Sequence, residues 1–151
     1  MIRLAWEVRQ VQALDPEGLR TLIRESRGEG FRFLARLTDD WRTGANRFDK
    51  PGEVLYVVAD GAAVVAVGGL NIDPYRGDPR LGRLRHLYVL RSARRKGLGT
   101  MLVRRILAHA SSVSFDTVRL RTDNPGAASF YEAMGFRRCP DSASATHELA
   151  L

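Results

Sequence analysis

Apolar and polar side chains alternate in several short stretches of the chain, which is the period expected of half-buried strands. Residues 2–8 show roughly this alternation. Two β-rich stretches, 54–59 and 62–70, lie on either side of Asp60-Gly61, a favoured hairpin turn. The other stretches predicted as strands are 84–90, 118–122, 136–138 and 146–151. The pattern therefore predicts about seven strands.

Four further stretches place apolar side chains three to four residues apart, as one face of a helix requires. The first follows Asp15-Pro16, which combines a capping carboxylate with a proline suited to the first helical position. The last ends at Gly135, a glycine suited to a C-terminal cap. The three later helices are predicted at 33–41, 97–110 and 127–134. With the strands, they predict a mixed α/β domain with one dominant sheet, a single domain over residues 1–151.

The bulk composition excludes several classes of protein. The 151 residues, 44% of them hydrophobic, suit one domain with an ordinary core. A single cysteine, Cys139, cannot form an internal disulfide, and the three histidines show no metal-ligand spacing, so no metal site is expected. Arg3, Glu7 and Arg9 interrupt the N-terminus where a signal peptide would be apolar, and the charge-free run 61–72 is too short for a bilayer. We expect a cytoplasmic protein without membrane contact.

The charge is strongly positive, and its carriers are nearly all of one kind. The net charge is +7, and 22 of the 24 basic residues are arginine. A positive field raises the local concentration of anionic ligands, which include nucleic acids and phosphate-rich cofactors such as CoA. The arginines are spread from Arg3 to Arg138 rather than gathered on one segment, and only residues 91–96 are densely basic. Composition alone favours neither kind of ligand.

One turn has the chemistry of a phosphate site. A predicted strand enters it, Arg94, Arg95 and Lys96 follow, and then Gly97 and Gly99 open a helix. Backbone N–H groups in a first helical turn lack internal partners, and the helix dipole adds partial positive charge there. Glycines allow an anion to approach that backbone closely. The pattern indicates a pyrophosphate site, although a solvated basic turn is the alternative.

Two familiar phosphate motifs do not fit this turn. It lacks the Gly-Lys-Ser/Thr ending of a Walker loop, and Gly97-Leu98-Gly99 is not followed by the third glycine of a Rossmann fingerprint. Arg94-x-x-Gly97-x-Gly99 after a strand instead resembles the acetyl-CoA signature of the GNAT acetyltransferases. A second match begins at Asn124 with Asn-Pro-Gly-Ala-Ala-Ser-Phe-Tyr-Glu-Ala-Met-Gly-Phe, which is similar to the asparagine, helix, tyrosine and Gly-Phe ending of that family. The resemblance covers nearly the whole chain.

This resemblance implies a fold and an activity. The fold would be a central, mostly antiparallel sheet of about seven strands, splayed at its middle and flanked by about four helices. The activity would be transfer of an acetyl group from acetyl-CoA to a primary amine of a small molecule, amino-acid-like or otherwise, or of a protein. The amine would attack directly in a ternary complex. Nucleic acid is not an expected partner, and a homodimer is expected only by analogy with the family.

The resemblance also implies roles for particular residues. The backbone of Leu87, Tyr88 and Val89 would pair with the pantetheine arm, and the N–H of Val89 would polarise the thioester carbonyl. Arg94 would lie at the edge of the pyrophosphate. The residues that would hold the pyrophosphate are Arg95, Lys96, Gly97, Leu98, Gly99 and Thr100.

Two residues of the second motif have a structural alternative each. Asn124 would hydrogen-bond the pantetheine, and it could equally cap the helix that follows; the two roles are compatible. Tyr131 would act as the general acid that protonates the departing thiolate. Alternatively, Phe130 and Tyr131 only fill core space.

The sequence departs from the family at the general base. Relatives carry a glutamate at the position of Arg83 or at that of Arg119, and an arginine cannot accept a proton at neutral pH. No base is assigned. The residues considered as acting through water, each with a structural or solvated alternative, are Glu25, Glu29, Asp73, His86 and His147. An acceptor that is already deprotonated needs no base.

The arginines suggest a hypothesis about the acceptor. Arg83, Arg119 or Arg85 would face it and bind a carboxylate, unless they only lie on a wet sheet face. The missing glutamates also favour an alternative function, a CoA-binding sensor or regulatory module without turnover, and the basic composition a third, a nucleic-acid-binding protein. The acceptor, the acyl-chain preference and the oligomeric state do not follow from the sequence.

Overall fold

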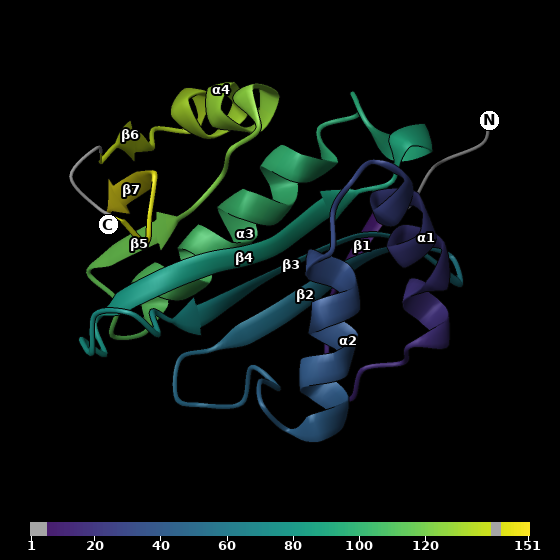
Figure 1. Cartoon of the computed structure of the whole chain (residues 1–151), viewed down its shortest axis with the longest axis horizontal. Helices are drawn as coiled ribbons and strands as arrows, with labels where there is room; N and C mark the ends of the chain where they lie inside the picture. Colours follow the sequence, from purple (N-terminus) through teal and green to yellow (C-terminus); the bar gives the residue numbers. More distant parts are fainter. Residues whose placement is uncertain (1–5, 140–142) are drawn as a thin grey trace.

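The computed structural model describes residues 6–139 and 143–151. Within them, seven strands form one sheet in the order β1-β2-β3-β4-β5-β7-β6 (Figure 1). Neighbouring strands are antiparallel except for the parallel pair β4 and β5. The strands are β1 (Trp6–Gln10), β2 (Val54–Asp60), β3 (Ala63–Ile72), β4 (Leu81–Val89), β5 (Thr117–Leu120), β6 (Arg137–Arg138) and β7 (His147–Ala150).

Helices cover both faces of this sheet. The α-helices are α1 (Arg20–Gly28), α2 (Phe33–Thr43), α3 (Leu98–Ser112) and α4 (Pro125–Ala133), and there are two short 3-10 turns, η1 (Glu17–Leu19) and η2 (Arg91–Ala93). Two hydrophobic clusters result, one that includes residues of α1 and α2 and one that includes residues of α3 and α4. This is the α/β fold with seven strands and four helices that the sequence predicts.

Strand β2 shows how the sequence supports two cores. Val54, Tyr56 and Val58 belong to the cluster of α3, while Leu55 and Val57 belong to the cluster of α1 and α2. All five are buried, because each face of this strand meets a helix layer. A strand buried on both faces reads as a continuous apolar run rather than as an alternation.

Strand β4 positions the site because its two edges are paired unequally. It pairs with β3 along most of its length, but it pairs with β5 only where Leu81–Arg83 meet Thr117–Arg119. The sheet therefore splays beyond Arg83. A bulge follows, because His86 and Leu87 lie opposite the single residue Gly68, and His86 has a φ of 62°.

The structure corrects two predicted boundaries and leaves part of a third untested. The hairpin loop is Gly61-Ala62 rather than Asp60-Gly61, because Asp60 pairs with Ala63 and the glycine takes the positive φ of 62°. Strand β4 begins at Leu81 rather than at 84, since it pairs there with β5. Residues 2–5 of the first predicted strand lie outside the described residues.

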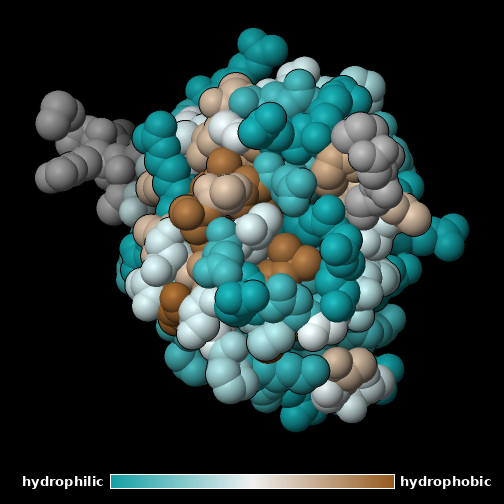
Figure 2. Space-filling model, turned by 90° about the vertical axis from the view of Figure 1, so that its left-hand side faces the viewer, coloured by the Kyte–Doolittle hydropathy of each residue, from teal (hydrophilic) through white to brown (hydrophobic). Residues whose placement is uncertain are grey.

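The predicted helix ends are close to the observed ones. The carboxylate of Asp15 accepts the N–H of Glu17 at 3.1 Å, as a cap would, but the turn it starts is η1 and α1 begins only at Arg20. Gly135 follows α4 with a φ of 103°, which is the conformation a glycine cap adopts. None of the helices in the described ranges is long and apolar enough to cross a membrane. Figure 2 shows one face as mostly hydrophilic, with hydrophobic residues in small patches near its middle.

Candidate active site

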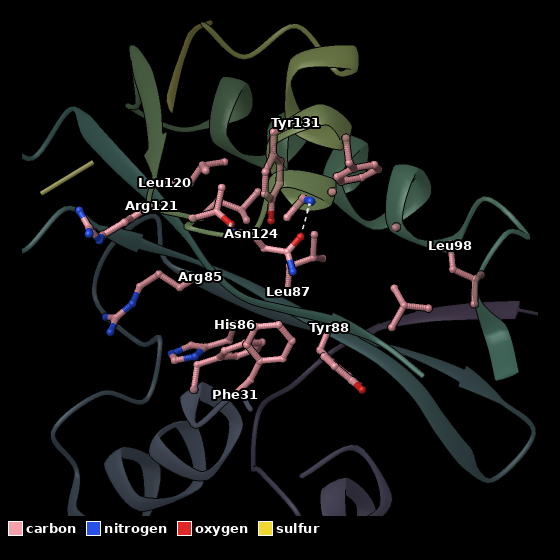
Figure 3. A pocket seen from close by; sticks show the side chains of 18 of the residues that line it. Phe31, Arg85, His86, Leu87, Tyr88, Leu98, Leu120, Arg121, Asn124 and Tyr131 are labelled. Carbon is pink, nitrogen blue, oxygen red and sulfur yellow. Dashed lines mark hydrogen bonds between the residues drawn. The ribbon is translucent and has the colours of Figure 1, made fainter. Parts of the chain in front are cut away.

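One cavity of about 930 Å³ follows the splayed edge of β4. At one end, called here the helix end, its wall is the turn that leads into α3. At the other, the distal end, its wall comes from the segment before α2, from α2 itself and from the residues after β5. Strand β4 runs through the middle, with Leu87 and Tyr131 on one side of it and Arg85 and His86 on the other (Figure 3).

The helix end presents backbone amides and two unusual backbone conformations. Arg95 and Gly97 have positive φ values of 64° and 81°. The first hydrogen bond of α3 runs from the N–H of Met101 to the carbonyl of Gly97, at 3.0 Å. The amides of the first turn, from Leu98 to Thr100, therefore have no partner within the helix. These are the donors that an anion would need.

The two glycines of the turn do different things. A Cβ at Gly97 would meet open space, and the positive φ is what disfavours any other residue there. Gly99 has no unusual φ, but a Cβ would lie 3.4 Å from the ring of Phe130 on α4. Gly97 is thus required by the backbone, whereas α3 and α4 would still pack with a small side chain at position 99.

Arg94 is already paired with a carboxylate. Its guanidinium donates to Glu29 at 2.8 Å and to the carbonyl of Val89 at 2.9 Å. Arg91 also donates to Glu29, at 3.1 Å, and the hydroxyl of Tyr88 does so at 2.6 Å. Arg94 above all, and then Tyr88, lower the pKa of Glu29 to about 2. The C-terminal end of α1 is thereby tied to the turn before α3.

The cavity wall contains the predicted cofactor residues with one exception. Lys96 is not in it; its ammonium lies 5.8 Å from the ring centre of Trp6. The predicted residues that do line the cavity are Leu87, Tyr88, Val89, Arg94, Arg95, Gly97, Leu98, Gly99, Thr100, Asn124 and Tyr131.

Tyr131 combines burial with access to the cavity. It is 7% exposed and packs edge-on against Phe130 and Phe136, with ring centres 5.2 and 5.6 Å away. Its hydroxyl points toward Asn124 and β4 (Figure 3). Burial raises the pKa of this phenol, so the proton stays on it at neutral pH.

Asn124 caps α4, as one of its two predicted roles requires. Its Oδ1 accepts the N–H of Ala127 at 3.0 Å, and Pro125 occupies the first helical position. The cap fixes the start of the helix that carries Tyr131. A contact between Asn124 and pantetheine stays a prediction.

Three of the residues considered as a base do not line the cavity. Glu25 accepts hydrogen bonds from the hydroxyl of Tyr88 and from the N–H of Arg91. Asp73 is buried against Arg83, and His147 bonds through Nε2 to a glutamate of α4 at 2.8 Å. These groups have structural partners.

His86 does line the cavity, and it is neutral. It is 7% exposed, and neither ring nitrogen has a hydrogen-bond partner of normal geometry in the described residues. Burial, together with the charges of Arg85 and Arg36, lowers its pKa to about 3, and the backbone of Phe33 opposes this only slightly. Such an imidazole is uncharged at neutral pH and is a weak base.

The structure separates the three arginines that the sequence groups together. Arg119 lies outside the cavity wall, buried beside Glu148 at 3.4 Å. Arg83 lines the cavity but donates to Asp73 at 3.3 Å and to the carbonyl of Ser144 at 2.6 Å. Of the three, only Arg85 faces the cavity without such partners in the described residues. The distal-end residues that sequence reasoning missed are Phe31, Phe33, Arg36, Tyr75 and Arg121, which come from three separate segments and share no motif.

Comparison with known proteins decides the family. The sequence profile of the "Acetyltransferase (GNAT) family" matches residues 17–136. The chain belongs to the GNAT acetyltransferases. The fold of this GNAT protein is also that of a proposed acetyltransferase from Exiguobacterium sp. 255-15, with a TM-score of 0.84, 29% identity and coverage of 97% of this chain and 94% of that one.

Two further solved structures show the same fold at lower identity. The GNAT N-acetyltransferase YhbS of Escherichia coli, solved in complex with CoA, has a TM-score of 0.74 and 21% identity over 99% of this chain and 83% of its own. A GCN5-related N-acetyltransferase of Kribbella flavida has a TM-score of 0.75 and 17% identity over 97% and 98%. Comparison with curated proteins found no match. Family membership makes this GNAT protein an acyl-CoA-dependent acyltransferase in general terms.

Proposed function

We propose that this GNAT protein is an N-acetyltransferase that moves the acetyl group of acetyl-CoA to a primary amine by direct attack in a ternary complex. The observation that carries the proposal is one continuous cavity that joins the first turn of α3, the splayed edge of β4 and Tyr131. Each of these supplies one requirement of the reaction: anion binding, an open strand edge and a proton donor.

The residues present fit CoA. The first-turn amides of α3 and the cation Arg95 suit a pyrophosphate. Beyond Arg83, β4 has no strand partner on the side of β5 within the described residues, so its backbone amides can pair with an amide-bearing arm. When bound, acetyl-CoA supplies a thioester carbonyl that an amine can attack.

The chain's own groups then act on the developing charges. The N–H of Val89 stabilises the negative charge on the carbonyl oxygen as the amine nitrogen bonds to the carbonyl carbon. The carbon–sulfur bond breaks, and Tyr131 donates its proton to the sulfur. Because burial keeps Tyr131 protonated in the resting state, the donor is ready at neutral pH. The nitrogen now bonded to the carbonyl carbon releases its extra proton to solvent and the phenolate takes one up from solvent, so the products are a neutral amide and the CoA thiol.

No carboxylate of the described cavity wall serves as a base. Glu29 is the one carboxylate among those wall residues. Its pKa of about 2 makes it a weak base, and its oxygens already accept hydrogen bonds from arginines. We therefore infer that the amine loses its proton to water before or as it attacks. The rate then depends on the fraction of acceptor that is unprotonated.

The test has two arms. Calorimetry with CoA and acetyl-CoA measures binding, and a thiol-release assay with acetyl-CoA and a broad amine panel measures transfer. Binding together with amine-dependent thiol release, and an acetylated amine identified by mass spectrometry, is the expected result. Binding without release for any amine would favour the CoA-binding module that does not turn over. No binding of either cofactor form at millimolar concentration would contradict the proposal.

A further inference from the structure

Arg85 is a half-buried cation without a matching anion. Its only hydrogen bond in the described residues is a long one, 3.4 Å to Oδ1 of Asn71, and no carboxylate there lies within ion-pair distance of it. Burial lowers its pKa, so the charge is partly removed from water. A desolvated arginine normally has a carboxylate or phosphate partner. The missing partner can come from the cavity, which Arg85 lines.

Two other arginines line the same distal end. Arg36 comes from α2 and makes no ion pair within the described ranges. Arg121 follows β5; its Nη1 donates to the carbonyl of Ala143 at 3.2 Å, and its Nη2 lies 3.5 Å from a carboxylate oxygen of the exposed Asp123. Figure 3 shows Arg85 and Arg121 at the end of the cavity away from Leu98. The carboxylate in the wall, Glu29, belongs to the helix end and is used there. The charged side chains that line the distal end are therefore all positive, and Asp40, outside the wall, is an acid whose charge acts on Arg85 without forming an ion pair with it in the described residues.

Resting on the proposed N-acetyltransferase function, we propose that the acceptor is an amine that also carries an oxyanion, a carboxylate or a phosphate, and that Arg85 binds this oxyanion with Arg36 and Arg121 beside it. A guanidinium presents paired N–H groups that match two oxygens of either group. A polyamine would instead bring positive charge to a positive wall.

The geometry of β4 limits the size of this acceptor. The reacting carbonyl is assigned to the N–H of Val89, and a strand advances about 3.3 Å per residue, so the backbone of Arg85 lies at most about 13 Å from that of Val89, less the shortening at the bulge. The long side chain of Arg85 spans part of this distance, so the amine and the oxyanion are separated by a few bonds. An amino acid or an aminoalkyl phosphate has this spacing.

Matched acceptors test the proposal. The thiol-release assay compares phenylalanine with 2-phenylethylamine and O-phosphoethanolamine with ethanolamine, and spermidine provides the polycationic arm. Each acidic acceptor is expected to exceed its partner at least about 10-fold in kcat/KM, corrected for the fraction of free amine. The pair with the larger ratio distinguishes a carboxylate from a phosphate. A preference for spermidine or for the partners without an anion would overturn the proposal.

Arginine variants assign the effect to the distal end. Arg85→Gln is expected to lower kcat/KM for the preferred acidic acceptor about 10- to 100-fold, the range for a lost charge-assisted pair, and to leave its uncharged partner within about 2-fold. Arg85→Lys keeps the charge without the paired donors and is expected between the two. Arg42→Gln, on α2 but outside the cavity wall, is the matched control and is expected to change neither. An equal loss for both acceptors in Arg85→Gln would contradict the proposal.

Binding measurements separate this inference from the proposed function. CoA should bind Arg85→Gln as it binds the natural protein, since Arg85 lies away from the helix end. If no amine is turned over, N-acetylphenylalanine is titrated into the CoA complex and compared with N-acetyl-2-phenylethylamine. Tighter binding of the acid, lost in Arg85→Gln, supports the oxyanion site even then; no binding of the acid at millimolar concentration rejects it. Loss of CoA binding by the natural protein would instead reject the proposed function.

Discussion

Both ends of the cavity carry arginines, but they differ in whether a carboxylate of the protein pairs with them. At the helix end, Arg91 and Arg94 share Glu29 at 3.1 and 2.8 Å, so a carboxylate of the protein compensates part of their charge. At the distal end, Arg85 is half-buried and has no carboxylate partner in the described residues. The helix end is therefore partly balanced without a ligand, whereas the distal end lacks a partner that a ligand would supply.

The largest effect is expected from a change at Tyr131, which lies between the two ends. Tyr131→Phe is expected to lower kcat about 100-fold, the lower part of the range for general acid catalysis, with little change in the KM for acetyl-CoA. The ring packing against Phe130 and Phe136 remains, so the melting temperature should hold. Thiol-release kinetics and thermal unfolding measure both quantities.

Tyr56→Phe is the matched control for this change, because Tyr56 is 5% exposed and lies outside the cavity wall. It should leave kcat unaltered. If Tyr131→Phe does the same, the tyrosine only packs, and the chemistry between the two ends needs another proton donor.

The pH profile tests whether either end supplies a base. His86 has a pKa of about 3, and the pKa of Tyr131 is raised, so neither changes protonation between about pH 6 and 9. The value of kcat/KM should then rise about 10-fold per pH unit until the pH reaches the pKa of the acceptor amine. Two acceptors with different amine pKa values should show correspondingly different inflections. A single inflection common to both would reveal an enzyme base.

The two glycines of the helix end allow a sharper test of how that end binds an anion. Gly97→Ala places a side chain at a φ of 81° and should lower the free energy of unfolding by about 1–2 kcal/mol. Gly99→Ala meets Phe130 at an ordinary 3.4 Å and should cost less than about 0.5 kcal/mol. Urea unfolding measures both.

Calorimetry with CoA completes this comparison. If the cofactor approaches the backbone at Gly99, then Gly99→Ala weakens CoA binding although the protein remains stable. An unchanged dissociation constant for CoA would show that the cofactor does not need close approach to the backbone at Gly99.

The sequence predicted the helix end well because its determinants are contiguous. The strand, the turn and the helix of residues 84–110 are neighbours in the chain, so the helix start and its free amides follow from local pattern, whereas the positive φ values of Arg95 and Gly97 were not predicted. The order of seven strands and four helices was predictable for the same reason. The local pattern missed the shifted hairpin loop, because the pairing of Asp60 with Ala63 decides it.

The distal end could not be predicted in the same way. Arg36, Tyr75 and Arg121 come from α2, from the loop after β3 and from the end of β5, and only the fold brings them to one wall. The bulge at His86 changes which side chains of β4 face each side, and no spacing in the sequence indicates it. Arg119, grouped by sequence with Arg83 and Arg85, turns out to be buried beside Glu148. The contacts that decide this end are long-range.

The smallest expected effect concerns the carboxylate that makes the two ends unlike. Glu29→Gln removes charge-assisted hydrogen bonds to Arg91 and Arg94 and should lower the free energy of unfolding by about 1.5 kcal/mol at pH 7. The folded pKa of about 2 lies below the ordinary 4.5, so this contribution is complete above pH 4.5 and is lost as the pH falls toward 2. Urea unfolding should therefore show a smaller difference in stability between Glu29→Gln and the natural protein at pH 3 than at pH 7. As a control, Glu17→Gln breaks an exposed ion pair and should change the free energy of unfolding little at either pH.

Glu29→Gln should also change CoA binding, because it leaves the arginines of the helix end without their carboxylate partner. CoA should bind this variant a few-fold more tightly. Weaker binding would mean that Glu29 positions Arg94 rather than competing with CoA for it.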